Sequence, residues 1–204
     1  GLSKSLVDNF LNVDGTPVDP TDEKYKDFNE VFKDRDGRLL AMVMHTGCKF
    51  KSNSLMNVRV YDETGTEAEQ KEKNKDISSP RLNGDGIYKN VTGFHTRLGI
   101  DTTYVTGNCE TAHVMFRYAE GLLCYAEAAA ELGQYNDNVA EKTLKPLRQR
   151  AGVVYVTPVA DPHFPFQGLP PAVQEVRRER RSELSLQGFR LDDLMRWRVA
   201  GTLK

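Results

Sequence analysis

The chain has 204 residues, a net charge of −1 and 39% hydrophobic residues, including eight tyrosines, nine phenylalanines and one tryptophan. This length and apolar content suffice for one large domain or for a piece of a larger protein. The near-zero charge excludes a whole-chain field that would steer the protein toward nucleic acid or acidic lipid. The sequence contains no run of 18 apolar residues, so it predicts no membrane span.

The first five residues, Gly1-Leu2-Ser3-Lys4-Ser5, contain no methionine and open no signal peptide. We therefore expect the sequence to be a fragment excised from a longer protein. Three cysteines are too few for a disulfide framework. Cys48 and Cys109 lie in loop-like sequence and would form a bridge only in an oxidising compartment, whereas Cys124 lies in a helical segment and is expected to be a free thiol.

The first half of the chain, residues 1–110, is rich in turn signals and short of helical periodicity. The apolar run 39–44 fits either a helix or a strand. Residues 56–61 alternate between apolar and polar side chains and predict a half-buried strand. Residues 63–76 are dominated by charged side chains and predict a solvated loop, and 87–100 mixes β-forming residues with glycines and predicts one or two strands.

The second half, residues 111–204, is helical, and its first helix is expected over 112–132. Two apolar stripes run along that helix at helical spacing. One comprises Tyr118, Leu122, Tyr125, Ala129 and Leu132, and the other comprises Phe116, Ala119, Leu123, Ala126 and Ala130. A helix that is apolar over more than half its circumference is packed from at least two sides, so we expect both stripes to be buried.

Three more helices are expected over 138–151, 171–187 and 191–199. Pro146 predicts a kink in the first of them, Pro171 suits the first turn of the second, and Gly188 is expected to end it. The Gly133-Gln134-Tyr135 turn partly matches the tetratricopeptide pattern of paired helices. The fold class is therefore mainly α, with helical hairpins of tetratricopeptide-like type, long loops and a few short strands, in a single domain over 1–204.

Arg180 interrupts the apolar stripe of the helix expected over 171–187. A buried guanidinium needs carboxylate partners, and Glu120 and Glu127 border the apolar face of the helix over 112–132. We therefore expect a structural salt-bridge network of Glu120, Glu127 and Arg180. The alternative is that the four arginines of 177–181 bind phosphate or nucleic acid, but acidic residues interleave with them and favour the structural interpretation.

Several segments of the chain together resemble the SusD/RagB family. They are Phe-Arg-Tyr-Ala-Glu-Gly-Leu-Leu-Cys-Tyr-Ala-Glu-Ala at 116–128, Leu-Arg-Gln-Arg-Ala-Gly-Val at 147–153, Glu-Arg-Arg-Ser-Glu-Leu at 179–184, Gln-Gly-Phe-Arg at 187–190 and Asp-Leu-Met-Arg-Trp at 193–197. The start of the chain agrees, with Arg35-Asp36-Gly37-Arg38-Leu39 in place of the family's Arg-Asp-Pro-Arg-Leu. The resemblance spans nearly the whole sequence and places it in the C-terminal portion of such a protein.

The resemblance implies a SusD-like fold and a non-enzymatic function. Proteins of this family capture oligosaccharides as surface-exposed lipoproteins of the outer membrane and deliver them to a TonB-dependent, SusC-like porin. A lipid anchor would lie in the missing N-terminal half, which would also carry most of the tetratricopeptide-like helix pairs. The resemblance implies no cofactor, no nucleic-acid partner and no catalytic residue.

Sugar binding requires exposed aromatic faces for pyranose rings, with polar groups nearby for the hydroxyls. In the loop-rich half, Tyr61, Tyr88, Phe94 and Tyr104 are the candidate carbohydrate-binding residues. The four histidines lack metal-ligand spacing, and no nucleophile elbow or phosphate loop occurs. Two alternatives stay open: a tetratricopeptide-like protein-interaction scaffold without a sugar ligand, and a glycoside hydrolase with a carboxylate pair.

Overall fold

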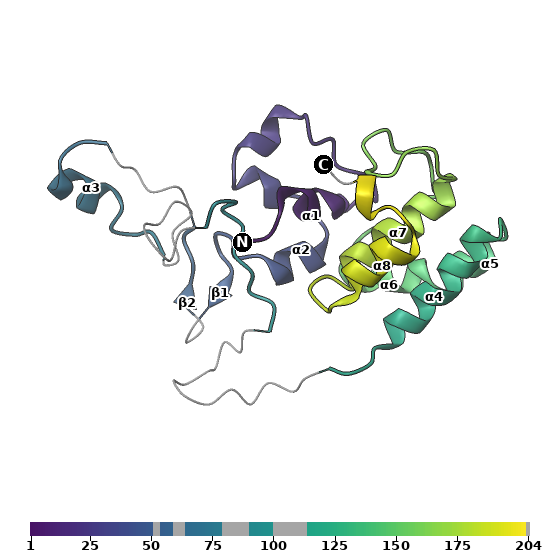
Figure 1. Cartoon of the computed structure of the whole chain (residues 1–204). Coiled ribbons are helices and arrows are strands. Elements are labelled where there is room, and N and C mark those ends of the chain that lie inside the picture. Colours follow the sequence, from purple (N-terminus) through teal and green to yellow (C-terminus); the bar gives the residue numbers. More distant parts are fainter. Residues whose placement is uncertain (51–53, 59–63, 79–89, 100–113, 203–204) are drawn as a thin grey trace. The chain divides into compact units, whose positions relative to one another are not determined.

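The computed structural model describes residues 1–50, 54–58, 64–78, 90–99 and 114–202 (Figure 1). Two compact units emerge from the contacts between residues. Unit 1 comprises Gly1–Val7, Thr21–Lys33 and Leu39–His113, and unit 2 comprises Asp8–Pro20, Asp34–Arg38 and Val114–Lys204. The helical half of the sequence therefore gathers two segments of the loop-rich half into its own unit.

The described residues are mainly α-helical, which confirms the predicted fold class. The early helices are α1 (Lys4–Asn9), α2 (Gly37–Met42) and α3 (Glu67–Lys73), with 3-10 turns at Glu23–Lys26 and Glu30–Phe32. The later helices are α4 (Tyr118–Glu131), α5 (Asp137–Lys142), α6 (Leu144–Ala151), α7 (Pro171–Glu183) and α8 (Phe189–Arg196), followed by a 3-10 turn at Ala200–Thr202. None of the helices in the described ranges is both long and hydrophobic enough to cross a lipid bilayer.

Unit 1 contains the one small sheet of the described residues. Its strands β1 (Lys49–Phe50) and β2 (Ser54–Leu55) are antiparallel, and Lys49 lies opposite Leu55. The strand expected over 56–61 is not found in its described part, since β2 ends at Leu55. A small core of Met44, Cys48, Met56 and Val58 lies beside this sheet.

The prediction of a solvated loop over 63–76 is wrong for its central part, which forms α3. Thr66 begins this helix through a capping box, because its hydroxyl accepts a hydrogen bond from the Glu69 amide and the Glu69 carboxylate accepts one from the Thr66 amide. This reciprocal pairing satisfies two of the donors that a helix start leaves open. A charged helix without buried residues can therefore form where composition alone indicated a loop.

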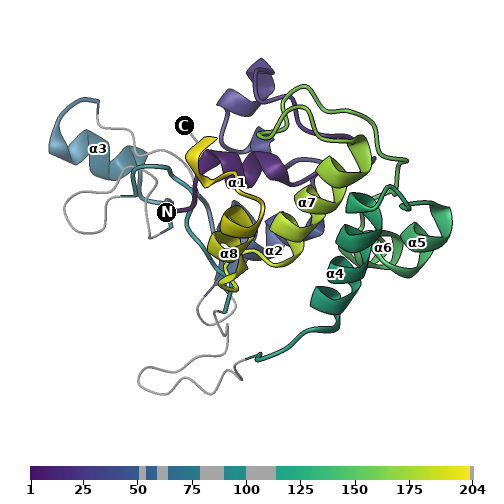
Figure 2. The same ribbon diagram turned by 45° about the vertical axis from the view of Figure 1, so that its right-hand side comes forward.

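The core of unit 2 is built where α4 packs along α7 and against α5 and α6 (Figure 2). Alanine, leucine and glutamate favour the helical state of α4, and Gly133 follows it with φ of 68°, in the left-handed region that favours glycine. The buried apolar residues of this core are Ala119, Leu123, Ala126, Ala130, Leu144, Leu147, Val173, Val176 and Leu184. They come from three separate stretches of sequence, 119–130, 144–147 and 173–184, that the fold brings together.

Helix bounds in unit 2 differ from the predictions at several points. Helix α4 begins at Tyr118 instead of 112, and α8 covers Phe189–Arg196 instead of 191–199. The helix expected over 138–151 is divided into α5 and α6 at Thr143, and Pro146 lies in the first turn of α6, where a missing amide is tolerated. Asn136 caps α5 by accepting hydrogen bonds from the amides of Asn138 and Val139. Helix α7 ends at Glu183, earlier than predicted, and Gly188 precedes α8 instead of terminating α7.

Candidate functional site

Helix α7 is strongly charged and yet almost entirely buried. Arg177, Arg178, Glu179, Arg180 and Glu183 are all less than a tenth exposed. A buried charge is stable only when opposite charges and hydrogen bonds replace its hydration. The partners of these side chains therefore determine whether α7 is a structural element or a binding surface.

The centre of the ion-pair network is Arg148 of α6, whose side chain is 0% exposed. Its Nε atom donates to Glu179 Oε2 at 2.9 Å, and its Nη2 atom donates to Glu175. On the other side, Glu179 Oε1 accepts a hydrogen bond of 2.5 Å from Arg38 Nη1. Arg38 in turn holds the buried carboxylate of Asp36 at 2.7 Å. This chain of charges joins α6 and α7 to the segment Asp34–Arg38.

A second carboxylate, Glu183, accepts hydrogen bonds from three arginines that are distant in sequence. They are Arg38 at 2.9 Å, Arg150 at 2.6 Å and Arg117, which immediately precedes α4. Nearer the start of α7, Arg178 binds Asp161 at 2.6 Å. Each of these contacts lies within unit 2, so the network fixes the positions of its helices relative to one another.

Arg180 is buried and forms its closest ion pair with Asp193 of α8, at 2.8 Å from Nε to Oδ1. Glu127 of α4 lies farther away, 3.9 Å from the same nitrogen. Instead, Glu127 accepts hydrogen bonds of 2.5 Å from both Arg196 and Trp197 Nε1. The carboxylate closest to Arg180 is therefore one that the sequence analysis did not single out.

Glu120, the other predicted partner, makes no ion pair with Arg180 in the described part of unit 2. It lies in the first turn of α4, half-buried, whereas Glu127 lies two turns farther on and is buried. Nothing in the local sequence pattern points to Asp193, because α8 reaches Arg180 only through the turn that follows α7. Finding this partner requires the tertiary structure.

The network also determines the charge state of its carboxylates. Burial by itself raises the pKa of Glu179, but the positive charges of Arg38 and Arg148 outweigh it and lower that pKa to about 2. For Glu127, burial is likewise outweighed, by the hydrogen bonds from Arg196 and Trp197, and its pKa is lowered. A general acid requires a raised pKa, so neither carboxylate is suited to that role.

The pKa of Arg181 in α7 is lowered to about 10. Burial is the main cause, the neighbouring charge of Arg190 adds to it, and Asp8 opposes it. The guanidinium of Arg190 also lies 5.8 Å from the ring centre of Trp197. At neutral pH Arg181 remains charged. No group of three or more histidine, cysteine or acidic side chains in the described residues could hold a metal ion.

Of the four candidate carbohydrate-binding residues, the structure describes only Phe94. Tyr61, Tyr88 and Tyr104 lie outside the described residues. Phe94 is 6% exposed, and its ring stacks on Phe28 at 5.6 Å between centroids and meets Phe32 edge-on at 6.4 Å. A sugar ring needs an exposed aromatic face, so the burial of Phe94 argues against this residue as a stacking platform.

Cys48 is a buried free thiol and Cys124 an exposed one. The proposed partner of Cys48, Cys109, lies outside the described residues.

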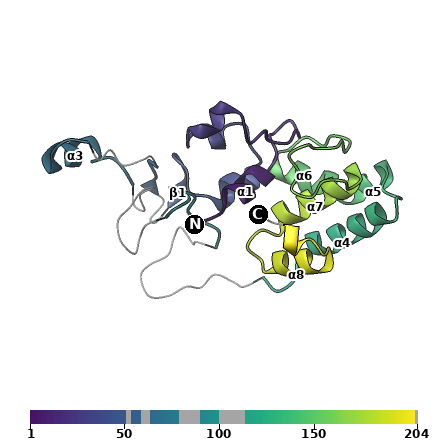
Figure 3. The same cartoon turned by 45° about the horizontal axis from the view of Figure 1, so that its top comes forward.

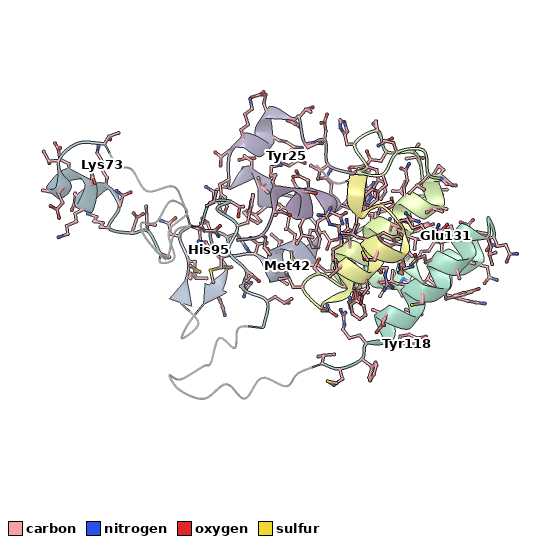
Figure 4. All side chains as sticks on the ribbon, viewed as in Figure 1. Tyr25, Met42, Lys73, His95, Tyr118 and Glu131 are labelled. Carbon is pink, nitrogen blue, oxygen red and sulfur yellow. The ribbon has the colours of Figure 1, made fainter. Side chains whose placement is uncertain are left out.

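The two apolar stripes of α4 have different environments, contrary to the expectation that both are buried. Ala119, Leu123, Ala126 and Ala130 are buried in the core of unit 2, but Phe116, the first residue of the same stripe, is 87% exposed. In the other stripe, Tyr118 is 83%, Tyr125 49% and Leu132 71% exposed. Figure 4 labels Tyr118 and Glu131 at the two ends of this helix. The expectation of burial is therefore wrong for Tyr118, Tyr125 and Leu132, whereas Ala129 of the same stripe is buried and Leu122 packs against the core.

A hollow of about 480 Å³ lies beside this exposed stripe, where α4 turns into α5. It is lined by Tyr125, Leu132, Gln134, Asn136, Asn138 and Val139, together with two alanines of α4. The Asn136 side chain is already engaged, because its Oδ1 atom caps α5 and its Nδ2 atom donates to the Gln134 carbonyl at 3.1 Å. The rest of the lining combines Tyr125 with alanine and aliphatic side chains and with the polar side chains of Gln134 and Asn138.

Comparisons by sequence and by structure lead to the same family of proteins. The model of the SusD family matches residues 1–203. A SusD-like carbohydrate binding protein from Bacteroides fragilis NCTC 9343 is similar in structure, with a TM-score of 0.66 and 29% identity over 96% of this chain. A second SusD-like protein from the same organism has a TM-score of 0.65 and 23% identity over 98% of this chain. No curated protein matches.

The chain spans only about a third of these two structures, 35% of the first and 36% of the second. Its match to the family is nevertheless continuous from residue 1 to residue 203. On this evidence the chain belongs to the SusD family.

Proposed function

We propose that the protein is a non-enzymatic glycan-binding component of a nutrient-uptake system in the outer membrane. In this role it captures oligosaccharides at the cell surface, anchored there by a lipid, and passes them to a SusC-like TonB-dependent transporter. The observation that carries the proposal is the family match over residues 1–203, together with the structural similarity to a protein described as carbohydrate binding.

The charge states in unit 2 support binding over hydrolysis. A glycosidase needs one carboxyl group that is protonated near neutral pH beside a second that is ionised. The pKa values of Glu179 and Glu127 are lowered instead, and Glu175, Glu183, Asp161 and Asp193 are also held by arginines. These groups stabilise the helices, and we assign them no chemical step.

We assign sugar contacts to the loop-rich half, at Tyr61, Tyr88 and Tyr104. An aromatic ring on a loop can lie against the apolar face of a pyranose while neighbouring amides bind its hydroxyls. A few contacts of this kind give dissociation constants of roughly micromolar to millimolar size. Neutral sugars make little use of long-range charge, so binding should persist at high salt.

The test begins with an oligosaccharide array probed with the purified protein, followed by calorimetric titration of each glycan that binds. Tyr88→Ala and Tyr104→Ala should each weaken binding at least about tenfold, the effect of losing roughly 1.4 kcal/mol. Tyr118→Ala is the matched control, because it removes an exposed tyrosine from α4 and should leave affinity unchanged. Release of reducing sugar by the purified protein would exclude the non-enzymatic function, and binding to no glycan on the array would count against sugar capture.

A further inference from the structure

Arg190, in the first turn of α8, forms no ion pair or hydrogen bond through its side chain within the described residues. Its half-buried guanidinium lies 5.7 Å from the ring centre of Phe166 and 5.8 Å from that of Trp197. Aromatic rings attract a guanidinium without using the five N–H donors in its plane. The two rings therefore position Arg190 and leave its donors for a ligand.

The carboxylates around Trp197 are already held by other arginines. Two of these arginines also lie over its ring, and their ion pairs are Arg177 with Glu131 at 2.8 Å and Arg196 with Glu127 at 2.6 Å. Asp193 raises the pKa of Arg190, but it binds Arg180 and Arg196, each at 2.8 Å. The charge of Arg190 is thus left over from the ion pairs of this region.

A second guanidinium, that of Arg181 in α7, lies close enough to Arg190 to feel its charge. Burial lowers the pKa of both side chains, and the charge of Arg190 lowers that of Arg181 further, against the opposing effect of Asp8. Two like charges in a half-buried place repel each other and have lost part of their hydration. An anion that contacts both groups would relieve the repulsion and replace the lost water.

The surface next to Arg190 is not a broad basic face. In α8 it is followed by the exposed side chains of Leu191, Asp192 and Met195, which are apolar or acidic, and the exposed Arg196 is already paired. Nucleic acid and acidic lipid surfaces bind to several exposed cations at once. A half-buried arginine between two rings instead fits one small charged group.

We propose that Arg190 and Arg181 together bind a small oxyanion, a carboxylate or sulfate group. A planar guanidinium can donate two parallel hydrogen bonds to two oxygens of such a group. The group is carried on a sugar, as in a hexuronic acid, and only this choice of carrier rests on the proposed function. The site does not involve the tyrosines to which we assign the contacts with neutral sugars.

Trp197 is the one tryptophan of the chain, so its fluorescence reports on this site. The chain is titrated with methyl glucuronide and with methyl glucoside, which differ only in the carboxylate, and with inorganic sulfate. Methyl glucuronide should change the emission with a dissociation constant of roughly millimolar size. Methyl glucoside should bind at least about tenfold more weakly, because it offers no charged acceptor. Calorimetric titration repeats each measurement without relying on Trp197.

Three variants assign the binding to Arg190. Arg190→Gln should weaken the affinity for methyl glucuronide at least about tenfold. Arg190→Lys keeps the charge but loses the paired donors, so its affinity should lie between those of the wild type and Arg190→Gln. Arg198→Gln is the matched control, because it removes the same charge from an exposed arginine of the same region, and it should change affinity less than about twofold. Thermal melts show which variants fold, and Arg190→Lys keeps the test open if Arg190→Gln does not.

Equal affinities for the glucuronide and the glucoside would overturn the proposal, as would equal losses for Arg190→Gln and Arg198→Gln. The site holds an adventitious ion only, and the proposal fails, if sulfate binds as tightly as methyl glucuronide and neither depends on Arg190. If sulfate depends on Arg190 and methyl glucuronide does not bind, the oxyanion site stands and the sugar carrier is wrong. None of these results depends on neutral glycans or on Tyr88 and Tyr104, so this proposal and the proposed function can fail separately.

Discussion

Arg148 and Glu179 form an ion pair that is closed to solvent, with 2.9 Å between Nε and Oε2 and exposed side-chain fractions of 0% and 1%. Around it, Glu175 binds the same arginine and Arg38 binds the same glutamate. Breaking a buried pair by removing one partner is far more destabilising than the pair's net contribution suggests, because the other charge is left uncompensated. The pair therefore marks a point at which a single substitution should have a large effect (Figure 3 shows α6 and α7, which carry the two residues).

Glu179→Gln should lower the free energy of unfolding by about 3 kcal/mol, because Arg38 and Arg148 both lose a buried negative partner. Urea denaturation followed by circular dichroism measures this change. Glu141→Gln is the control, since Glu141 is 64% exposed and pairs with Lys145 on the surface. Surface pairs of this type contribute less than about 1 kcal/mol, and similar losses for the two variants would contradict a structural role for the buried network.

The same pair predicts a dependence of stability on pH. The pKa of Glu179 is lowered from 4.5 to about 2 in the folded protein. A lowered carboxyl pKa stabilises the fold fully above the unfolded value, and this stabilisation is lost as the pH falls through the folded value. The free energy of unfolding should therefore decrease between about pH 5 and pH 2, and Glu179→Gln should flatten that part of the curve. Equal slopes for the two proteins in urea melts at these pH values would show that Glu179 is not the titrating group.

Much of the secondary structure of unit 2 could be predicted, because its signals are local. Alanine and leucine content favours α4, Asn136 caps α5, and Pro171 begins α7. Thr66 and Glu69 also have the spacing of a capping box, which is a sequence signal for the start of a helix. The high charge of residues 63–76 led to the prediction of a loop instead. Helix ends were less predictable: α7 ends at Glu183 with no glycine or proline to terminate it there.

The partners within the network could not be predicted, since they depend on tertiary contacts. Charge pattern indicated that Arg180 needs a carboxylate, but which of several acidic residues supplies it depends on how α8 returns to α7. The pairing of Arg38 with Glu179 is harder still to predict, because the two residues lie 141 positions apart in the sequence. The sequence also predicted two buried stripes on α4 without indicating that Tyr118, Tyr125 and Leu132 are exposed.

Asp193→Asn tests the partner that the structure gives to Arg180. The substitution removes the charge facing Arg180 at 2.8 Å and a contact to Arg196, and it should cost about 3 kcal/mol of unfolding free energy. Glu120→Gln, at the partner expected from sequence, should change stability by no more than about 0.5 kcal/mol. Chemical denaturation of both variants decides between the two carboxylates, and a larger loss for Glu120→Gln would restore the sequence-based pairing.

Leu123→Ala and Leu132→Ala compare the two sides of α4 directly. Leu123 is fully buried among the alanines and leucines of the core, so truncation should leave a cavity and cost about 2–5 kcal/mol. Leu132 is exposed at the end of the helix, and the same truncation should stay within about 0.5 kcal/mol. Both substitutions replace leucine by alanine, the best helix former, so helix propensity contributes almost equally to the two measurements. Their difference in urea denaturation therefore reports burial, and equal losses would mean that the outer stripe of α4 is covered in this chain as well.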